Sequence, residues 1–228
     1  METGIVAKDV CVMEDSLNKQ ILEWWYQLPD KLRGNKPTFI HQLNKNAEIL
    51  FVGLNPSGIT KEQMAINEIS EKDIEEKIKL EQRAIWGEGQ TREGQYKSYY
   101  GPLNSIADEL QMKFEHCDLF HMSYRTAKVV KEELYEKNGD LKPLHQMHLS
   151  VFIQILNYLN PKVVITNNVI SANILKKYLD LKFDKRILMY KNSHGQFFFL
   201  SGIMSYGRLT IYDRERLVEI IKRALNIK

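Results

Sequence analysis

The sequence has only two cysteines, Cys11 and Cys117, and neither lies in a CxxC pair. A disulfide framework and a structural zinc site both need clustered thiols, so we expect neither. Glycine and proline are also sparse, with 12 and 6 residues, and no low-complexity segment interrupts the chain. Together with 43% hydrophobic and 27% charged residues, this is the composition of an ordinary globular protein and not of a disordered one.

A long apolar run is missing too. No stretch approaches the roughly 18 apolar residues that a membrane helix requires. The first residues, METGIVAKDVCVMEDS, carry acidic side chains early and lack the apolar core of a signal peptide. We therefore expect a cytoplasmic protein that does not enter a membrane. At 228 residues and 43% hydrophobic content, the chain predicts one large globular domain over 1–228.

The net charge of +3 is small, but it is unevenly distributed. From Lys176 to Lys228 there are twelve basic and five acidic residues, whereas the preceding 175 residues hold twenty basic and twenty-four acidic ones. A cationic C-terminal quarter suits an anionic partner such as nucleic acid. The alternative is a solvated basic surface with no partner.

Hydrophobic periodicity predicts strands that alternate with helices. Short apolar runs predict five strands, at 49–53, 114–120, 161–167, 185–190 and 196–201. Amphipathic patterns predict helices at 14–28, 61–86, 99–112 (opening at Pro102), 143–159, 168–179 and 212–225. This alternation predicts an α/β fold, a single three-layer α/β/α domain with a mostly parallel central sheet. Residues 1–45 form an N-terminal helical extension and 59–98 a charged insertion.

Polar residues follow several of the predicted strands, where open parallel sheets bind ligands. The first strand runs into Gly53-Leu54-Asn55-Pro56-Ser57-Gly58, a turn that lacks the dinucleotide and P-loop glycine patterns. The others are followed by His121-Met122-Ser123, Thr166-Asn167-Asn168 and Ser201-Gly202-Ile203-Met204-Ser205. Asn55 then either serves chemistry or is a plain turn residue, and the pair Asn167-Asn168 is best explained as a cap of the following helix.

FVGLNPSG resembles the first motif of the uracil-DNA glycosylase superfamily, whose mismatch-specific branch reads GINPG there. YYGPLNSIADEL, DLFHMSYRTA and LNPKVVITNNVISANIL resemble the elements that follow, and FFFLSGIMSYGRL takes the place of the second motif, HPSPLS or NPSGLS. The resemblance covers roughly 46–225. It implies a uracil-DNA glycosylase-like fold and cofactor-free hydrolysis of the N-glycosidic bond of uracil or a related damaged base in DNA.

The resemblance also implies roles for individual residues. Asn55 positions the attacking water, and the backbone of Leu54 lies against the base beside Gly53, Pro56 and Ser57. Tyr100 is the favoured aromatic that stacks on the base, chosen from Trp86, Tyr96, Tyr99 and Tyr100. His121 reads the base edge, and the loop containing Ser201, Gly202 and Ser205 enters the minor groove. The expected partner is uracil-containing or mismatched DNA, bound by a monomer.

The chain departs from the family pattern at the second motif, where Leu200 stands in place of the leading histidine or asparagine. Two cysteines also exclude the iron–sulfur branches, which need four ligands. A superfamily member that binds nucleic acid but catalyses weakly or not at all is therefore the alternative function. An unrelated α/β domain that reached GLNPSG by convergence is a third. His145 and His148 form a weak metal-ligand pattern, and Trp24-Trp25 is expected to pack the first helix.

Overall fold

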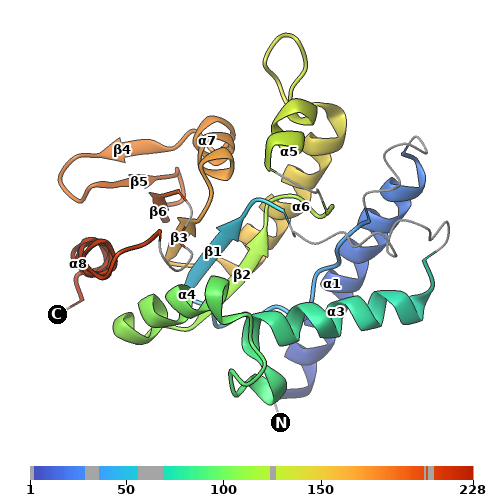
Figure 1. Cartoon of the computed structure of the whole chain (residues 1–228), viewed down its shortest axis with the longest axis horizontal. Coiled ribbons are helices and arrows are strands. Elements are labelled where there is room, and N and C mark those ends of the chain that lie inside the picture. Colours follow the sequence, from blue (N-terminus) through green and yellow to red (C-terminus); the bar gives the residue numbers. More distant parts are fainter. Residues whose placement is uncertain are drawn as a thin grey trace. The chain divides into compact units, whose positions relative to one another are not determined.

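A computed structural model describes residues 3–28, 36–55, 69–123, 127–202, 204 and 208–227. Within these residues the chain forms seven α-helices, a short 3-10 helix and six strands (Figure 1). The helices are α1 (Thr3–Tyr26), α3 (Glu71–Trp86), α4 (Lys97–Leu110), α5 (Ala127–Leu134), α6 (Pro143–Leu159), α7 (Val169–Tyr178) and α8 (Ile211–Leu225). The strands are β1 (Ile49–Gly53), β2 (Phe114–Asp118), β3 (Val163–Thr166), β4 (Lys182–Asp184), β5 (Met189–Lys191) and β6 (Phe197–Leu200), and the 3-10 helix is η2 (Glu88–Gln90).

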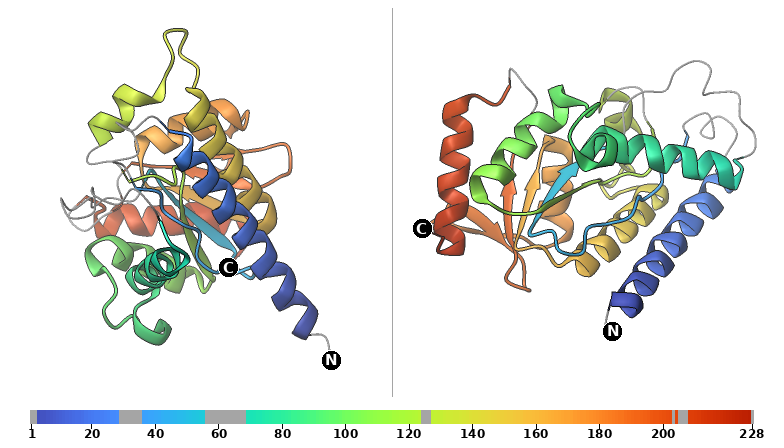
Figure 2. Two further views of the ribbon diagram at one scale, coloured as in Figure 1. Left: turned by 90° about the vertical axis from the view of Figure 1, so that its right-hand side faces the viewer. Right: turned by 90° about the horizontal axis from the view of Figure 1, so that it is seen from below.

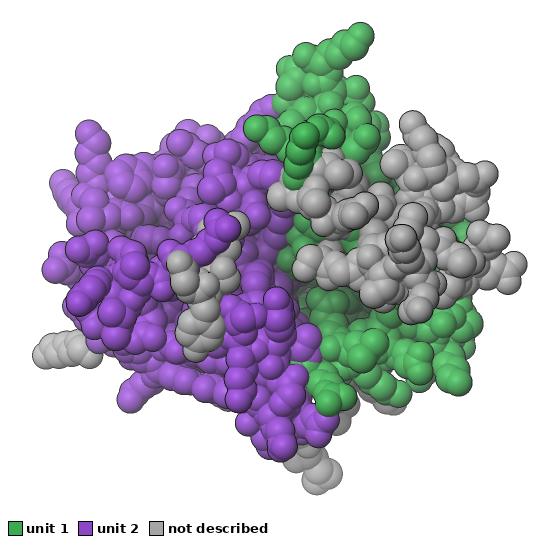
Figure 3. All heavy atoms as spheres, viewed as in Figure 1, with its two compact units in different colours: residues 1–43, 55–83, 118–155 green, residues 44–54, 84–117, 156–228 purple. Residues whose placement is uncertain are grey.

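The chain folds into two compact units, each assembled from three separate segments (Figure 3). Unit 1 comprises residues 1–43, 55–83 and 118–155, and unit 2 comprises 44–54, 84–117 and 156–228. The division falls between Leu54 and Asn55, inside the motif that follows β1. The expectation of one domain over 1–228 stays a prediction.

The central sheet has the order β2-β1-β3-β6-β5-β4. β1 pairs in parallel with β3, with Ile49 opposite Val163, and β3 pairs in parallel with β6. The mostly parallel α/β sheet predicted from the sequence is therefore confirmed. β5 and β4 extend it as an antiparallel hairpin on the β6 side. β1 and β3 are buried along their whole length, which explains their near-continuous apolar sequences.

Helices α4 and α8 cover one face of this sheet (Figure 2). Ile106 of α4 and Ile221 of α8 belong to one apolar cluster with Phe51 and Ile165. Helix α7 contributes nothing to that cluster, although its Leu175 is fully buried. The β1–α4–β2 and β3–α7–β6 connections run toward opposite edges, and right-handed crossovers then put α4 and α7 on opposite faces.

In unit 1, polar side chains fasten the segment 36–43 to α1. The Asn18 side chain donates to the Ile40 carbonyl at 2.9 Å and accepts from the Ile40 N–H at 2.6 Å. Glu14 accepts from the Leu43 N–H at 2.6 Å. Trp24 and Trp25 are buried, as expected of residues that pack the first helix.

Several boundaries differ from the predicted ones. α4 begins at Lys97, so Pro102 lies inside the helix and does not open it. A proline removes only its own donor, and the first turn is closed upstream by the Tyr100 N–H donating to the Tyr96 carbonyl. Residues 185–188 form a turn between β4 and β5, where a continuous strand was expected. β4 is short and mostly polar, so its periodicity does not predict a strand. The predicted elements also omit α5, although its buried Val130 and Leu134 lie four residues apart on one helix face.

Among the helices that the structure describes, none combines the length and the apolar character needed to cross a membrane.

Candidate functional site

The carboxyl ends of β1 and β3 lie side by side at the centre of the sheet. Val52 is opposite Thr166, and the Asn167 N–H donates to the Val52 carbonyl at 3.0 Å. From β1 the chain leads to β2 on one side, and from β3 it leads to β6 on the other. This is a topological switch point, the place where open α/β sheets bind their ligands. The GLNPSG motif leaves the sheet here.

Predicted site residues of unit 2 gather at this edge. Gly53 ends β1, and its carbonyl accepts from the Ser171 hydroxyl at 2.9 Å. Leu54 is buried directly after it. At the end of β6, the Ser201 N–H donates to the Thr166 hydroxyl at 2.8 Å, and that hydroxyl donates to the Ser201 carbonyl at 3.2 Å. These bonds fix, beside β3, the start of the loop that is predicted to enter the minor groove of DNA.

Other predicted residues are placed less directly. Gly202 packs against α7, where an added Cβ would lie 3.6 Å from a methyl carbon of Val169. Pro56, Ser57 and Ser205 lie outside the described residues. Their proposed contacts with base and phosphate stay predictions.

In unit 2, polar side chains from different elements form a series of contacts that the sequence patterns did not predict. The Asn167 amide donates to the Tyr99 hydroxyl at 2.5 Å, and that hydroxyl lies 3.2 Å from His116 Nε2. Asn167 and His116 are 4% and 2% exposed, whereas Tyr99 is half-buried. The sequence did hold one signal for the position of His116. It is two residues from Phe114, and in a pleated strand both side chains then face α4.

Tyr100, the favoured base-stacking residue, packs inside the α4 face of the sheet. Its ring meets that of His116 edge-on at 5.1 Å, and the ring is 7% exposed. The ring of Tyr99 also lies edge-on to Tyr100, at 4.8 Å. Of the two tyrosines, Tyr99 keeps more of its surface accessible. The stacking role of Tyr100 stays a prediction.

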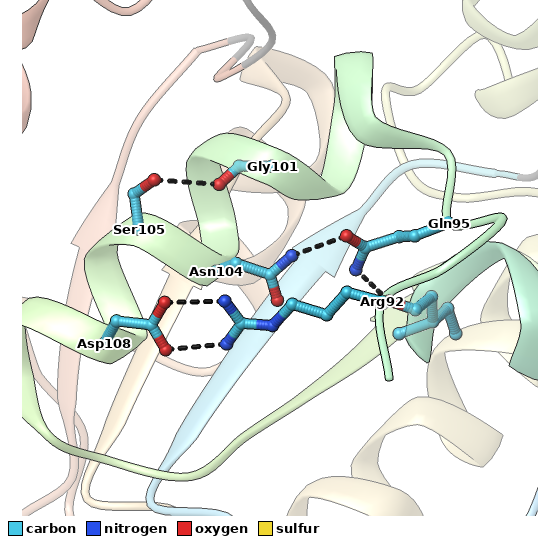
Figure 4. Close-up of polar contacts among 7 residues, drawn as sticks. Arg92, Gln95, Gly101, Asn104, Ser105 and Asp108 are labelled. Atoms are coloured by element: carbon cyan, nitrogen blue, oxygen red, sulfur yellow. Dashed lines mark hydrogen bonds and ion pairs between the residues drawn. The ribbon is translucent and has the colours of Figure 1, made fainter. Parts of the chain in front are cut away.

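Hydrogen bonds and an ion pair join the loop before α4 to that helix (Figure 4). Gln95 donates to the Ile85 carbonyl and accepts from the Asn104 amide at 2.7 Å. Arg92 makes a bidentate pair with Asp108, at 2.7 and 2.6 Å. A cavity of about 520 Å³ opens beside these residues, but Arg92, its strongest cation, is already paired. We therefore assign this cavity a structural role.

The start of that loop requires glycine. Gly87 has φ 77°, and a Cβ there would lie 2.5 Å from the Arg92 backbone. Any side chain would push the loop away from Arg92, so the glycine sets the position of Gln95 and α4.

His121 belongs to a buried histidine cluster in unit 1. The His121 N–H donates to Nδ1 of His148 at 3.1 Å, and the His148 ring lies 6.2 Å from that of His145. All three side chains are at most 5% exposed. Burial lowers the pKa of His121 to about 4. Burial, with Lys142 nearby, lowers the pKa of His145 to about 4, and burial takes the pKa of His148 well below its ordinary value.

The cluster is therefore neutral at pH 7. The Nε2 atoms of His121 and His148 are buried and make no hydrogen bond within the described part of the chain. No three His, Cys, Asp or Glu side chains among the described residues are arranged to hold a metal ion. The base-reading role of His121 stays a prediction.

Unit 1 also holds two half-buried carboxyl groups, on Glu81 and Asp118, that the sequence patterns above do not single out. Burial raises the pKa of Glu81, and the nearby His41 partly opposes this. Burial and the charge of Glu81 raise the pKa of Asp118 well above its ordinary value. Carboxyl groups that repel each other share protons, which suits acid–base chemistry near neutral pH.

Lys77 lies one helical turn before Glu81 on α3. Burial lowers the pKa of Lys77 to about 8, and Lys36 adds to the effect. Its ammonium donates to the Pro37 carbonyl at 3.2 Å. Lys77 and Glu81 are four residues apart, a spacing that places two side chains on the same face of a helix. This spacing was the sequence signal that could have pointed to the pair. Asn55 belongs to the same unit and is half-buried.

In comparisons with known proteins, no family model matches the chain and no curated protein is similar to it.

Proposed function

We propose that this protein is a DNA base-excision glycosylase with a uracil-DNA glycosylase-like three-layer α/β/α fold, which hydrolyses the N-glycosidic bond of uracil or a related damaged base. One observation carries the proposal: GLNPSG follows β1 directly, at the switch point between β1 and β3. A similar turn sequence that arose by chance could follow any strand. This motif follows the strand at which the topology of the sheet favours ligand binding.

The proposed reaction adds water to the anomeric carbon of the sugar as the carbon–nitrogen bond breaks. The sugar gains positive charge, and the base departs with the bonding electron pair as an anion. Asn55 orients the water, and the backbone of Leu54 lies against the base. The water loses one proton to solvent, and the base anion takes one up after release. No cofactor is required.

The DNA must present the base outside the helix, because the bond to be cleaved is inaccessible in a stacked duplex. Base flipping costs least at a mismatched or unpaired position, so uracil at such a position is the expected substrate. The basic C-terminal quarter supports this proposal by offering phosphate contacts. The loop containing Ser201, Gly202 and Ser205 is proposed to enter the minor groove.

The titratable groups of unit 1 support an enzyme over a passive binding domain. Glu81, Asp118 and Lys77 all have a pKa displaced toward neutrality, and such displacement is typical of catalytic sites. A structural role would be served at lower cost by apolar side chains in these positions.

The test replaces Asn55 with alanine and measures single-turnover release of uracil from an oligonucleotide. We expect the rate to fall about 10²-fold or more, since one preorganised polar group is lost. Stability should change by about 0.5 kcal/mol or less. Asn138→Ala is the matched control, because Asn138 also lies on a turn of unit 1 and its side chain is exposed. Equal release by wild type and Asn55→Ala would remove Asn55 from the mechanism.

A nucleic-acid-binding protein without efficient catalysis is the second candidate. Leu200 favours it: this half-buried residue ends β6 where the family carries a histidine or asparagine. A panel of oligonucleotides with different modified bases separates the two functions. Binding without release of any base would support the second candidate.

A further inference from the structure

The β4–β5 hairpin extends the sheet beyond its parallel part (Figure 1). Lys182 is opposite Lys191, and Phe183 is opposite Tyr190. β4 is the last strand in the sheet order, so its outer edge pairs with no strand of the described chain. Short edge strands with lysines resist pairing with other sheets, which leaves the hairpin available to another kind of partner.

The hairpin is strongly cationic. Its basic side chains surround a cavity of about 460 Å³ that is open to solvent; the lining residues are Lys182, Phe183, Asp184, Lys185, Arg186 and Lys191. Lys182 is paired with Asp180 at 2.6 Å. Lys185 and Arg186 are exposed, and the described part of the chain shows no ion pair for either, so two cations face solvent without a carboxylate partner. Lys191 is half-buried, with its ammonium 4.6 Å from the centre of the Phe197 ring. This arrangement complements a polyanion.

The aromatic side chain of Phe183 also lines this cavity. Phe183 is 49% exposed, and its ring lies 5.0 Å from that of Tyr190, on the neighbouring strand. Lys176 lies over the other ring of the pair, with its ammonium 5.4 Å from the Tyr190 centroid. A half-exposed phenylalanine on an edge strand contributes little to the core, but it offers a flat apolar surface to a partner.

We propose that the β4–β5 hairpin is a docking site for single-stranded DNA. Lys185 and Arg186 would contact backbone phosphates while Phe183 stacks on an unpaired base. Basic residues with interleaved aromatic rings are the recurring solution for single strands, since every base has a face to stack on. A duplex keeps its base faces covered, so it would use the cations alone.

This inference rests on the proposed function for the choice of DNA as the partner. Its test measures fluorescence anisotropy of a labelled oligothymidine of about 12 nucleotides, within the usual range of single-strand sites. The first variant, Lys185→Glu/Arg186→Glu, should weaken binding by tenfold or more. It should also reduce the slope of log affinity against log salt by about 1.4, or 0.7 for each lost phosphate contact.

The second variant, Phe183→Ala, should weaken oligothymidine binding about tenfold and leave the salt slope unchanged, because stacking releases no counterions. Phe183→Trp should restore binding. Two controls match these changes. Lys128→Glu/Lys131→Glu reverses two exposed charges on α5, and Leu188→Ala removes an exposed apolar side chain from the same hairpin. Both controls should bind like the wild type.

Two results would overturn the inference. One is equal binding by wild type and Lys185→Glu/Arg186→Glu when thermal melts show both folded. The other is competition by polyglutamate at the same charge concentration together with full binding by Phe183→Ala. In that case the hairpin attracts any polyanion and reads no base.

Uracil release separates this inference from the proposed function. If the wild type releases uracil and the hairpin variants keep its KM and kcat, the docking site is wrong while the glycosylase stands. If the wild type releases no base but oligothymidine binding still depends on Phe183, the glycosylase is wrong while the docking site stands.

Discussion

The interiors of the two compact units differ in their titratable groups. Unit 2 buries an apolar cluster around Phe51 together with Glu115 and His116, and its buried amides Asn104 and Asn167 are hydrogen-bonded. Unit 1 buries more titratable side chains, including His121, His145 and His148, whose ionised forms burial disfavours. Two buried imidazole nitrogens of unit 1, on His121 and His148, make no hydrogen bond within the described residues.

This contrast suggests different roles for the two units, one that supports the fold and one that carries groups able to exchange protons. A buried apolar cluster stabilises a fold at every pH, whereas buried titratable groups make stability depend on pH. Proteins keep such groups mainly where function needs them. We therefore expect the sheet of unit 2 to act as the rigid support and unit 1 to supply the groups that exchange protons.

The largest expected effect comes from breaking the core of unit 2. Phe51→Ala should destabilise the protein by about 3–5 kcal/mol, because the ring is fully buried and its removal leaves a cavity. The loss should be the same at pH 5 and pH 7. Urea unfolding followed by Trp86, in a variant with Trp24 and Trp25 replaced by phenylalanine, measures it from unit 2 itself.

Phe183→Ala is the matched control, since the same atoms are removed from a half-exposed site. It should cost about 0.5 kcal/mol or less. A loss at Phe51 that grows markedly toward pH 5 would contradict the division between the two interiors.

Acid should destabilise unit 1 more than unit 2. The folded pKa of His121 and of His145, about 4, lies below the ordinary 6.5, so the unfolded chain takes up protons first. Stability is thus fully present above pH 6.5 and is lost between 6.5 and 4, by about 3 kcal/mol for each histidine. Glu81 and Asp118 oppose part of this loss, because their raised pKa values favour the folded state in acid.

The measurement uses Trp86→Phe, which leaves Trp24 and Trp25 as reporters of unit 1. His194→Gln is the control, because His194 is exposed on the β5–β6 turn. It should leave the pH slope unchanged, whereas His121→Leu should flatten it. Identical acid midpoints for the unit 1 and unit 2 reporters would disprove the expected difference.

The strands and helices were easier to predict from the sequence than the candidate site. The strand that ends at Gly53 and the helix over 143–159 agree with their predicted bounds, since long apolar runs and clean periodicity depend on local sequence. The start of α8 also follows local sequence, since Thr210 caps it and accepts from the Asp213 N–H at 3.1 Å.

The candidate site was less predictable because its neighbours are far apart in sequence. Tyr99 and Asn167 are 68 residues apart, and no local pattern announces that their side chains meet. The displaced pKa values of Glu81 and Asp118 likewise arise from burial and mutual repulsion across 37 positions. A motif such as GLNPSG indicates where to look, but the partners come only from the fold.

A smaller effect is expected from neutralising the half-buried carboxyl group of Glu81. Glu81→Gln should stabilise unit 1 by about 1 kcal/mol at pH 8, because the folded state then no longer has to keep a carboxyl protonated or buried with charge. The raised pKa of Glu81 means that this gain must shrink as pH falls and vanish in acid. Glu76→Gln, at an exposed position of α3, should change nothing. Equal melting temperatures for Glu81→Gln and wild type at pH 8 would argue against a buried titrating group.

The smallest effect on stability is expected from removing a helix cap in unit 2. No titratable group takes part in this cap. Asn168 precedes α7, and its side chain accepts from the Ile170 N–H at 2.8 Å. Asn168→Ala leaves that donor without its acceptor and should cost about 1 kcal/mol, equally at pH 5 and pH 8. Asn168→Ser should retain most of the stability, because a serine hydroxyl accepts the same bond.

The consequence of the Asn168 change should be local before it is global. α7 carries Ser171, whose hydroxyl donates to the Gly53 carbonyl, so fraying of the first turn loosens the backbone where GLNPSG leaves the sheet. Hydrogen exchange should therefore speed up at Ile170 and its neighbours while Ile221 of α8 stays protected. If release of uracil is detected, its rate should fall by less than in Asn55→Ala, because the cap positions the motif without touching the substrate. Faster exchange spread evenly over unit 2 would mean that Asn168 supports the whole sheet and not this edge alone.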